Sequence, residues 1–137
     1  MPATVYMKDK ILDEYFGKQS YTVPSMWYAG ICTSVNSTGG ISGEPSTAVG
    51  YDRVAVVNDD IATVWSSAAS GVKTNGNGQI QFGTVTSSEW GTLTYFFLAD
   101  GSTGGNVCWY TTMASLTASV GMAPYVNTGN LTITISS

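Results

Sequence analysis

The stretch LTYFFLA (Leu93–Ala99), followed by DGSTGG (Asp100–Gly105) and NVCWYTTM (Asn106–Met113), decides the fold of this chain. Two apolar runs rich in aromatic and β-branched residues flank a cluster of turn-forming residues, and this pattern predicts a β-hairpin. In the first run, apolar side chains alternate onto both faces of the strand, so both faces should be covered. This strand is therefore predicted to lie centrally in a sandwich or half exposed at a subunit interface.

Further short strands are expected before and after this hairpin. Turn-rich segments separate the apolar runs Met26–Thr33, Tyr51–Val57, Gln79–Phe82 and Leu131–Ile135. The last of these alternates apolar residues with threonine, which is typical of a strand with one face in solvent. The sequence therefore predicts an all-β body.

Two long polar segments are predicted to be loops. Ser34–Val49 contains several glycines and a proline and is long enough to act as an arm. Asn58–Gly78 is expected to be a polar loop with a short element near Ile61–Trp65. We predict that these loops and the N-terminal segment Met1–Tyr6 contact neighbouring molecules.

Six of the fourteen charged residues lie in the first 18 positions, where the sequence predicts the one helix. Thr4 is placed to cap its start, and Gly17 is placed to end it in a left-handed conformation. Apolar residues recur with helical spacing at Met7, Ile11, Leu12, Tyr15 and Phe16. We expect an amphipathic helix of about three turns that lies on a sheet.

These elements together predict one domain over residues 1–137. Residues 1–17 form the N-terminal arm and helix, and residues 18–137 form the β body. The expected fold class is mainly β, an antiparallel β-sandwich of jelly-roll-like form with one N-terminal amphipathic helix.

Composition excludes several classes of function. The chain has no histidine, only 10% charged residues and a net charge of -4. Its five cations form no basic patch, so nucleic acid is not an expected partner. The sequence contains no run of about 18 apolar residues, so no membrane span is predicted. It also has no apolar run near the N-terminus, so no secretory signal is predicted.

The sequence also argues against an enzyme. Without histidine, the Ser-His-Asp and Cys-His arrangements are impossible. Ser70-Gly71-Val72-Lys73 matches an S-x-x-K pattern, but the motifs that accompany it in penicillin-recognising enzymes are missing. Cys32 and Cys108 are expected to be free buried thiols, and two cysteines supply too few ligands for a metal site. No catalytic residue, cofactor or metal is predicted.

A few residues are candidates for an interface. Trp65 and Trp90 flank loops and could form a contact surface, whereas Trp27 and Trp109 lie in strong strand patterns and should pack inside. Arg53, the only arginine, is expected to form a structural ion pair or an intersubunit bond. The candidate interface residues are Tyr6, Glu44, Arg53, Trp65 and Trp90.

Several short motifs, in their order and spacing, resemble a family of small virion proteins of tailed bacteriophages. Such proteins are often labelled tail fibre or minor structural protein. The motifs are D-E-Y-F-G at Asp13–Gly17, Ser20–Pro24, Gly50–Arg53, Trp90–Tyr95, Ala99-Asp100 with Gly104–Asn106, and Gly129–Ile135. The resemblance implies a non-catalytic, β-sandwich-like virion component.

Two locations on the particle follow from this resemblance. A small, compact domain without an elongated shaft or repeats fits a capsid decoration or cement protein that binds the outer head surface and stabilises it. The alternative is a tail-fibre or tail-tip module that binds a host receptor or carbohydrate. The expected partners are the major capsid protein and further copies of the chain, most simply in a trimer, after synthesis in the host bacterial cytoplasm.

Overall fold

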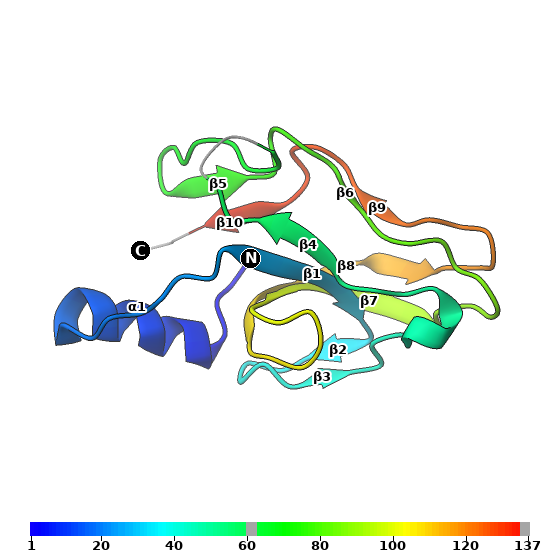
Figure 1. Cartoon of the computed structure of the whole chain (residues 1–137), viewed down its shortest axis with the longest axis horizontal. Helices are drawn as coiled ribbons and strands as arrows, with labels where there is room; N and C mark the ends of the chain where they lie inside the picture. Colours follow the sequence, from blue (N-terminus) through cyan, green and yellow to red (C-terminus); the bar gives the residue numbers. More distant parts are fainter. Residues whose placement is uncertain (60–62, 135–137) are drawn as a thin grey trace.

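The computed structural model describes residues 1–59 and 63–134. One helix, α1 (Val5–Gly17), precedes a series of strands (Figure 1). The strands are β1 (Met26–Cys32), β2 (Ser34–Val35), β3 (Ile41–Ser42), β4 (Val54–Val57), β5 (Val72–Thr74), β6 (Ile80–Gln81), β7 (Thr92–Ala99), β8 (Val107–Thr117), β9 (Tyr125–Val126) and β10 (Thr132–Thr134). A short 3-10 helix, Thr47–Val49, lies between β3 and β4.

A four-stranded antiparallel sheet, in the order β4-β1-β7-β8, forms the centre of the molecule. The two-stranded ladders β10-β5 and β6-β9 lie on one side of this sheet, and the β2-β3 hairpin lies on the other (Figure 1). The predicted fold class, mainly β with antiparallel sheets and one N-terminal helix, is confirmed. The second layer consists of separate two-stranded ladders.

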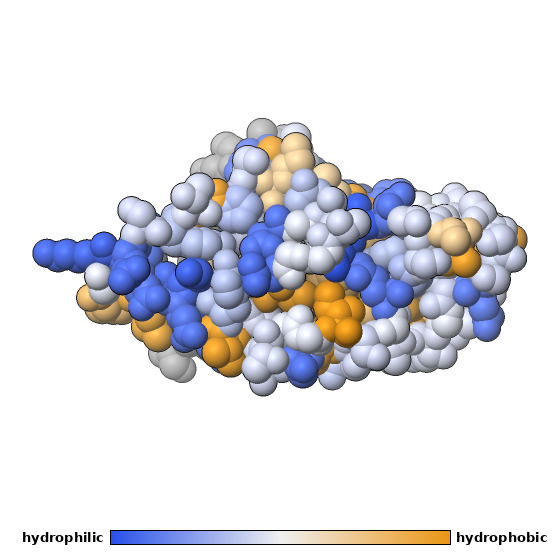
Figure 2. All heavy atoms as spheres, turned by 60° about the horizontal axis from the view of Figure 1, so that its bottom comes forward, coloured by the Kyte–Doolittle hydropathy of each residue, from blue (hydrophilic) through white to orange (hydrophobic). Residues whose placement is uncertain are grey.

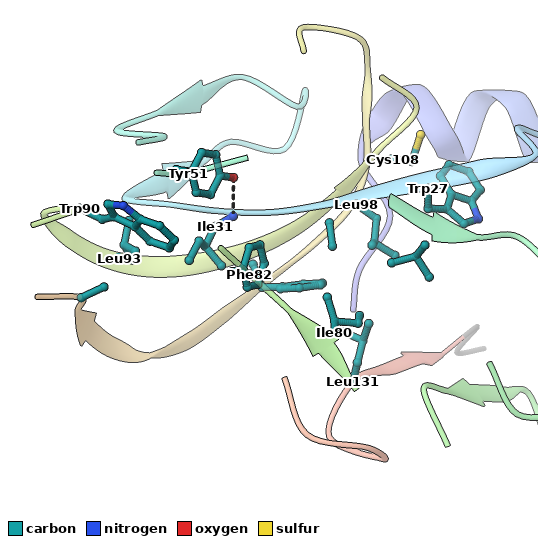
Figure 3. Packing of buried hydrophobic residues seen from close by; sticks show 14 of the residues in the cluster. Trp27, Ile31, Tyr51, Ile80, Phe82, Trp90, Leu93, Leu98, Cys108 and Leu131 are labelled. Carbon is teal, nitrogen blue, oxygen red and sulfur yellow. Dashed lines mark hydrogen bonds between the residues drawn. The ribbon is translucent and has the colours of Figure 1, made fainter. Parts of the chain in front are cut away.

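Strand β7 is central, and other parts of the chain cover both of its faces. Phe96 and Leu98 pack into the main core, whereas Phe97 and Ala99 pack into a smaller cluster beneath the β2-β3 hairpin. A register shift between Leu93 and Tyr95 turns Leu93 into the main core as well. The main core joins β1, β7 and the β6-β9 ladder (Figure 3). Of the two positions predicted for this strand, the structure has the central one.

The helix differs from its prediction in where it lies relative to the sheet and in which residue ends it. Thr4 caps it as expected, with its hydroxyl accepting the Met7 N–H at 3.4 Å. The left-handed residue at the end is Lys18 (φ 56°), not Gly17. Only Met7 is buried, and the second half of α1 extends past the sheet instead of lying on it (Figure 1). The helix is attached at its start, where Ala3 bridges to Trp109 at the edge of β8.

The two predicted loops contain more structure than expected. Ser34–Val49 is not a free arm, because it forms the β2-β3 hairpin and the 3-10 helix. Asn58–Gly78 contains β5, which pairs with β10. Part of the predicted element near Ile61–Trp65 and the last residue of the predicted strand Leu131–Ile135 lie outside the described residues.

Both cysteines are free thiols in the interior, as predicted. Burial raises the pKa of Cys32 and that of Cys108 to about 12, so both remain protonated at neutral pH. Within the described residues, α1 is too short and too polar to cross a membrane.

Gly30, in the middle of β1, packs closely against the neighbouring strand β7. A Cβ atom added there would overlap the ring of Phe97 on β7. We expect Gly30→Ala to lower the free energy of unfolding by about 2 kcal/mol, because a side chain must displace a fully buried ring. Urea denaturation measures this loss.

A helical glycine provides the matched control. A Cβ at Gly17 would make only ordinary contacts of 3.7 Å or more, so Gly17→Ala should leave stability unchanged or slightly raised. If the clash with Phe97 causes the loss, the double variant Gly30→Ala/Phe97→Leu should cost less than the sum of the two single changes. Additive costs would contradict this explanation.

Candidate functional site

Glu44 and Arg53, two of the predicted interface residues, bind each other inside the molecule. Arg53 donates from Nε to Glu44 Oε1 at 2.7 Å and from Nη2 to Oε2 at 2.9 Å. Its Nη1 donates to the carbonyl oxygens of Gly101 and Gly104 at 2.8 and 2.7 Å. The side chain of Arg53 is only 5% exposed and that of Glu44 22%. Arg53 therefore forms the structural ion pair that the sequence analysis expected, and it fastens the β7-β8 turn.

Tyr51 extends this network into the sheet. Its hydroxyl donates to Glu44 Oε1 at 2.9 Å and accepts the Ile31 N–H at 3.1 Å (Figure 3). Burial and then the adjacent Glu44 carboxylate raise the pKa of Tyr51. The hydrogen bond to Glu44 raises the pKa of Arg53 against the opposing effect of burial. The cluster is a fixed internal brace with both charges neutralised, and it offers no reactive group.

The two tryptophans proposed for a contact surface are buried, so that prediction is wrong for this chain. Trp65 is 1% exposed and Trp90 is 5% exposed. The Trp90 indole N–H donates to the Val49 carbonyl at 2.8 Å, and its ring packs edge-on against Tyr51 (Figure 3). The loops beside them fold over the core, which draws both rings inward. Trp27 is buried and Trp109 packs partly buried against the core, as expected.

Tyr6 lies on α1 near its attachment to the body. It is partly buried against the core, and the ammonium of Lys10 lies 5.6 Å from the centre of its ring. Burial, with smaller contributions from Asp100 and Cys108, raises the pKa of its hydroxyl. A role for Tyr6 in an interface stays a prediction.

A groove of about 530 Å³ lies between β8 and β9. One wall is the run Thr111–Leu116 of β8, and the other is Pro124–Asn127, which includes β9. The buried lining residues belong to the main core and are Ile31, Phe82, Phe96 and Leu131. No lining residue is charged. The groove is therefore an uncharged depression with an apolar base.

The groove exists because two strand edges face each other without pairing. β8 is the last strand of the central sheet, and the N-terminal segment covers its outer edge only as far as Tyr110. In the described part of the chain, β9 pairs only with β6. The gap between these edges is open to solvent at the rim, while the core residues at its base are at most 3% exposed.

Polar groups and one aromatic ring surround the opening. Tyr125 stands on the rim and is 56% exposed. Asn127 and Asn130 are exposed, and neither amide side chain has a hydrogen-bond partner within residues 1–59 and 63–134. Buried Asn75 holds this wall in place, since its amide donates to the Asn127 carbonyl at 2.9 Å and accepts the Leu131 N–H at 2.9 Å. The wall held by Asn75 thus presents two free side-chain amides beside the exposed ring of Tyr125.

Sequence reasoning missed this groove. Tyr125 follows Pro124 in a segment without clear alternation, so no strand was predicted there. The detectable signal was the pair of amide residues at positions 127 and 130 close to a tyrosine. Only the fold shows that this group faces Thr111–Leu116.

The comparisons with known proteins agree with a virion component. The chain belongs to the family described as Podophage GP4 fiber I protein gp80, which matches residues 2–134. A comparison with curated proteins found no match. The resemblance to structural proteins of tailed phages is thereby confirmed over almost the whole chain. The family description names a fibre, and so favours the tail alternative over capsid decoration.

The brace around Arg53 generates a test of stability. We expect Arg53→Met to lower the free energy of unfolding by about 3 kcal/mol, because it leaves the Glu44 carboxylate and two carbonyl groups without their donor. Methionine keeps an apolar stem over the ring of Phe97, which lies 5.0 Å from the guanidinium carbon. Asp52→Asn removes an exposed charge at the adjacent position and should change stability by less than about 0.5 kcal/mol. Equal, small effects in urea denaturation would show that the pair behaves as a surface ion pair.

Proposed function

We propose that this chain is a structural, non-catalytic subunit of a phage tail fibre and that its groove contacts a neutral carbohydrate of the host surface. The family match over residues 2–134 is the observation that carries the tail location. The capsid alternative depended on the compact form of the domain, and a domain of this form serves equally well as one module of a fibre. In this proposal the major capsid protein is not a partner.

The groove suits a neutral glycan better than a charged ligand. None of its lining residues carries a charge, so neither a phosphate nor an acidic peptide would find a counter-ion there. A sugar presents hydroxyl groups at its edges and C–H groups on its faces. The free amides of Asn127 and Asn130 can donate to and accept from hydroxyl groups, and the Tyr125 ring can pack against a C–H face.

The shape of the groove supports the same proposal. Binding sites for small ligands combine concave apolar surface with a few polar groups that fix orientation, and the groove has both features. Its volume of about 530 Å³ lies within the range of such sites. Because Asn75 fixes the wall from behind, little rearrangement is needed on binding.

The location is tested by counting copies on the particle. Quantitative mass spectrometry of purified virions should give far fewer copies of this chain than of the major capsid protein, because a tail carries few fibres and a head lattice carries many capsomers. A ratio near one, or near a simple fraction of one, would instead establish decoration of the head. Absence from virions would contradict both locations.

Ligand binding is tested by screening the purified chain on an array of neutral bacterial surface oligosaccharides. The strongest hit is then titrated in solution, so that the affinity of single sites is measured. Tyr125→Ala should lower this affinity at least about tenfold, since it removes the exposed ring of the rim.

Tyr15→Ala is the matched control. It removes an even more exposed tyrosine, 78% against 56%, on α1 and outside the groove, and should leave the affinity unchanged. An array without hits, or equal affinities of both variants, would contradict the carbohydrate proposal and leave the copy number as a separate result.

A further inference from the structure

The second half of α1 carries large apolar side chains that the body does not cover. Leu12 is 54% exposed, Tyr15 is 78% exposed and Phe16 is 85% exposed. At the start of the helix, Val5 is 44% exposed. Hydrophobic and charged residues lie side by side over this end of the molecule (Figure 2, left). Two adjacent exposed aromatic residues on one helix indicate a contact surface.

The exposed apolar residues form one line along the helix. At 3.6 residues per turn, Val5, Leu12 and Phe16 lie within about 40° of one another, on the side opposite buried Met7. Asp9 lies on the same side, between Val5 and Leu12. The exposed stripe therefore consists of three apolar side chains and one carboxylate, and it faces away from the body.

The two flanks of this stripe carry different charges. One flank holds Lys8 and Tyr15, and the other holds Asp13, next to Asp9 in the stripe. Lys8 has no acidic residue three or four positions away, so it has no partner at helical spacing. Lys10, in contrast, lies beside Tyr6 and has Glu14 four positions later, so it has an oppositely charged residue at helical spacing within its own helix.

We propose that copies of this chain associate through α1 in a parallel bundle, most simply a trimer, in which Lys8 of one copy pairs with Asp13 of the next. In a parallel arrangement, the lysine flank of each helix meets the acidic flank of its neighbour. The spacing of five residues between Lys8 and Asp13 matches the ion pairs between flanking positions of parallel coiled coils. An antiparallel arrangement would instead bring the flank with Asp13 against the same flank of its neighbour.

The bundle also explains how the outer half of α1 is stabilised. A helix of 13 residues is marginal in water by itself, and this one buries only Met7 against its own body. Its end turns also carry no charge that favours its dipole, since no acidic residue lies in the first turn and no basic residue lies in the last. Packing the stripe against neighbouring copies buries the Phe16 ring of each chain, partly covers Tyr15 on the flank and brings Lys8 to the Asp13 carboxylate of the next copy.

The contact is small, which determines how it must be measured. One short helix offers less than the roughly 800 Å² per partner of a standard interface. Association should therefore be weak between free subunits and strong where copies are held together on a particle at an effective concentration of about 1 mM. The experiment is sedimentation equilibrium of the whole chain up to about 1 mM. We expect a reversible monomer–oligomer equilibrium, and the fitted mass gives the number of copies.

A charge exchange tests the pairing and its direction. Lys8→Glu alone and Asp13→Lys alone should each weaken association at least about tenfold, because each places like charges on facing flanks. An equimolar mixture of the two variants should associate more strongly than either alone, since the carboxylate introduced in one variant then meets the ammonium introduced in the other. Leu12→Ser, which removes apolar surface from the stripe, should leave only monomer.

Glu89→Lys is the matched control for Asp13→Lys, because it makes a closely similar change at an exposed position outside α1. It should leave association unchanged, and circular dichroism should show every variant folded. A monomeric chain at all concentrations would overturn the proposal. Association that Leu12→Ser does not abolish would place the contact elsewhere, and a mixture no stronger than its components would rule out the parallel pairing.

Discussion

The ring of Phe97 contacts both the backbone of Gly30 and the guanidinium of Arg53, and these contacts join the centre of the sheet to the segment before β4. The absence of a Cβ at Gly30 lets the ring pack directly on β1. The guanidinium carbon lies 5.0 Å from the centre of the ring, and the same guanidinium forms the hydrogen bonds with Glu44. The central strand pair and the segment before β4 are thus locked by one aromatic side chain. Because interiors are close-packed, such a contact tolerates little change of volume.

A second constraint follows from the low charge of the chain. With 10% charged residues, the loops cannot rely on ion pairs, and amide side chains satisfy the backbone instead. Asn36 accepts from the N–H groups of Thr38 and Gly40, and so shapes the β2-β3 turn. Buried Asn75 does the same for the wall of the groove. Because these local bonds hold the loops, the edges of the short strands can remain unpaired. The groove lies between two such unpaired edges.

Sequence patterns predicted what depends on local alternation and missed what depends on distant contacts. The β7 strand and the ion pair of Arg53 could be predicted, since two-sided apolar alternation and a lone arginine in an apolar run each have few stable solutions. The burial of Trp65 and Trp90 could not, because it depends on how loops return over the core. The helix shows the same division. Thr4 and the spacing indicated its start, but whether its apolar stripe meets a sheet depends on where the sheet ends.

The groove and the exposed stripe of α1 lie toward opposite ends of the molecule, since α1 extends from one end and β9 lies near the other (Figure 1). A parallel bundle formed by α1 would gather the helices at one end and leave the grooves free at the other. A shallow, uncharged groove provides few strong contacts, so each site should bind weakly by itself. Several such sites held in fixed register convert weak single contacts into strong attachment whenever a surface presents repeated ligands at a matching spacing. The low affinity expected for one groove and for one helix contact is then consistent with a fibre in which repeated copies together give strong attachment.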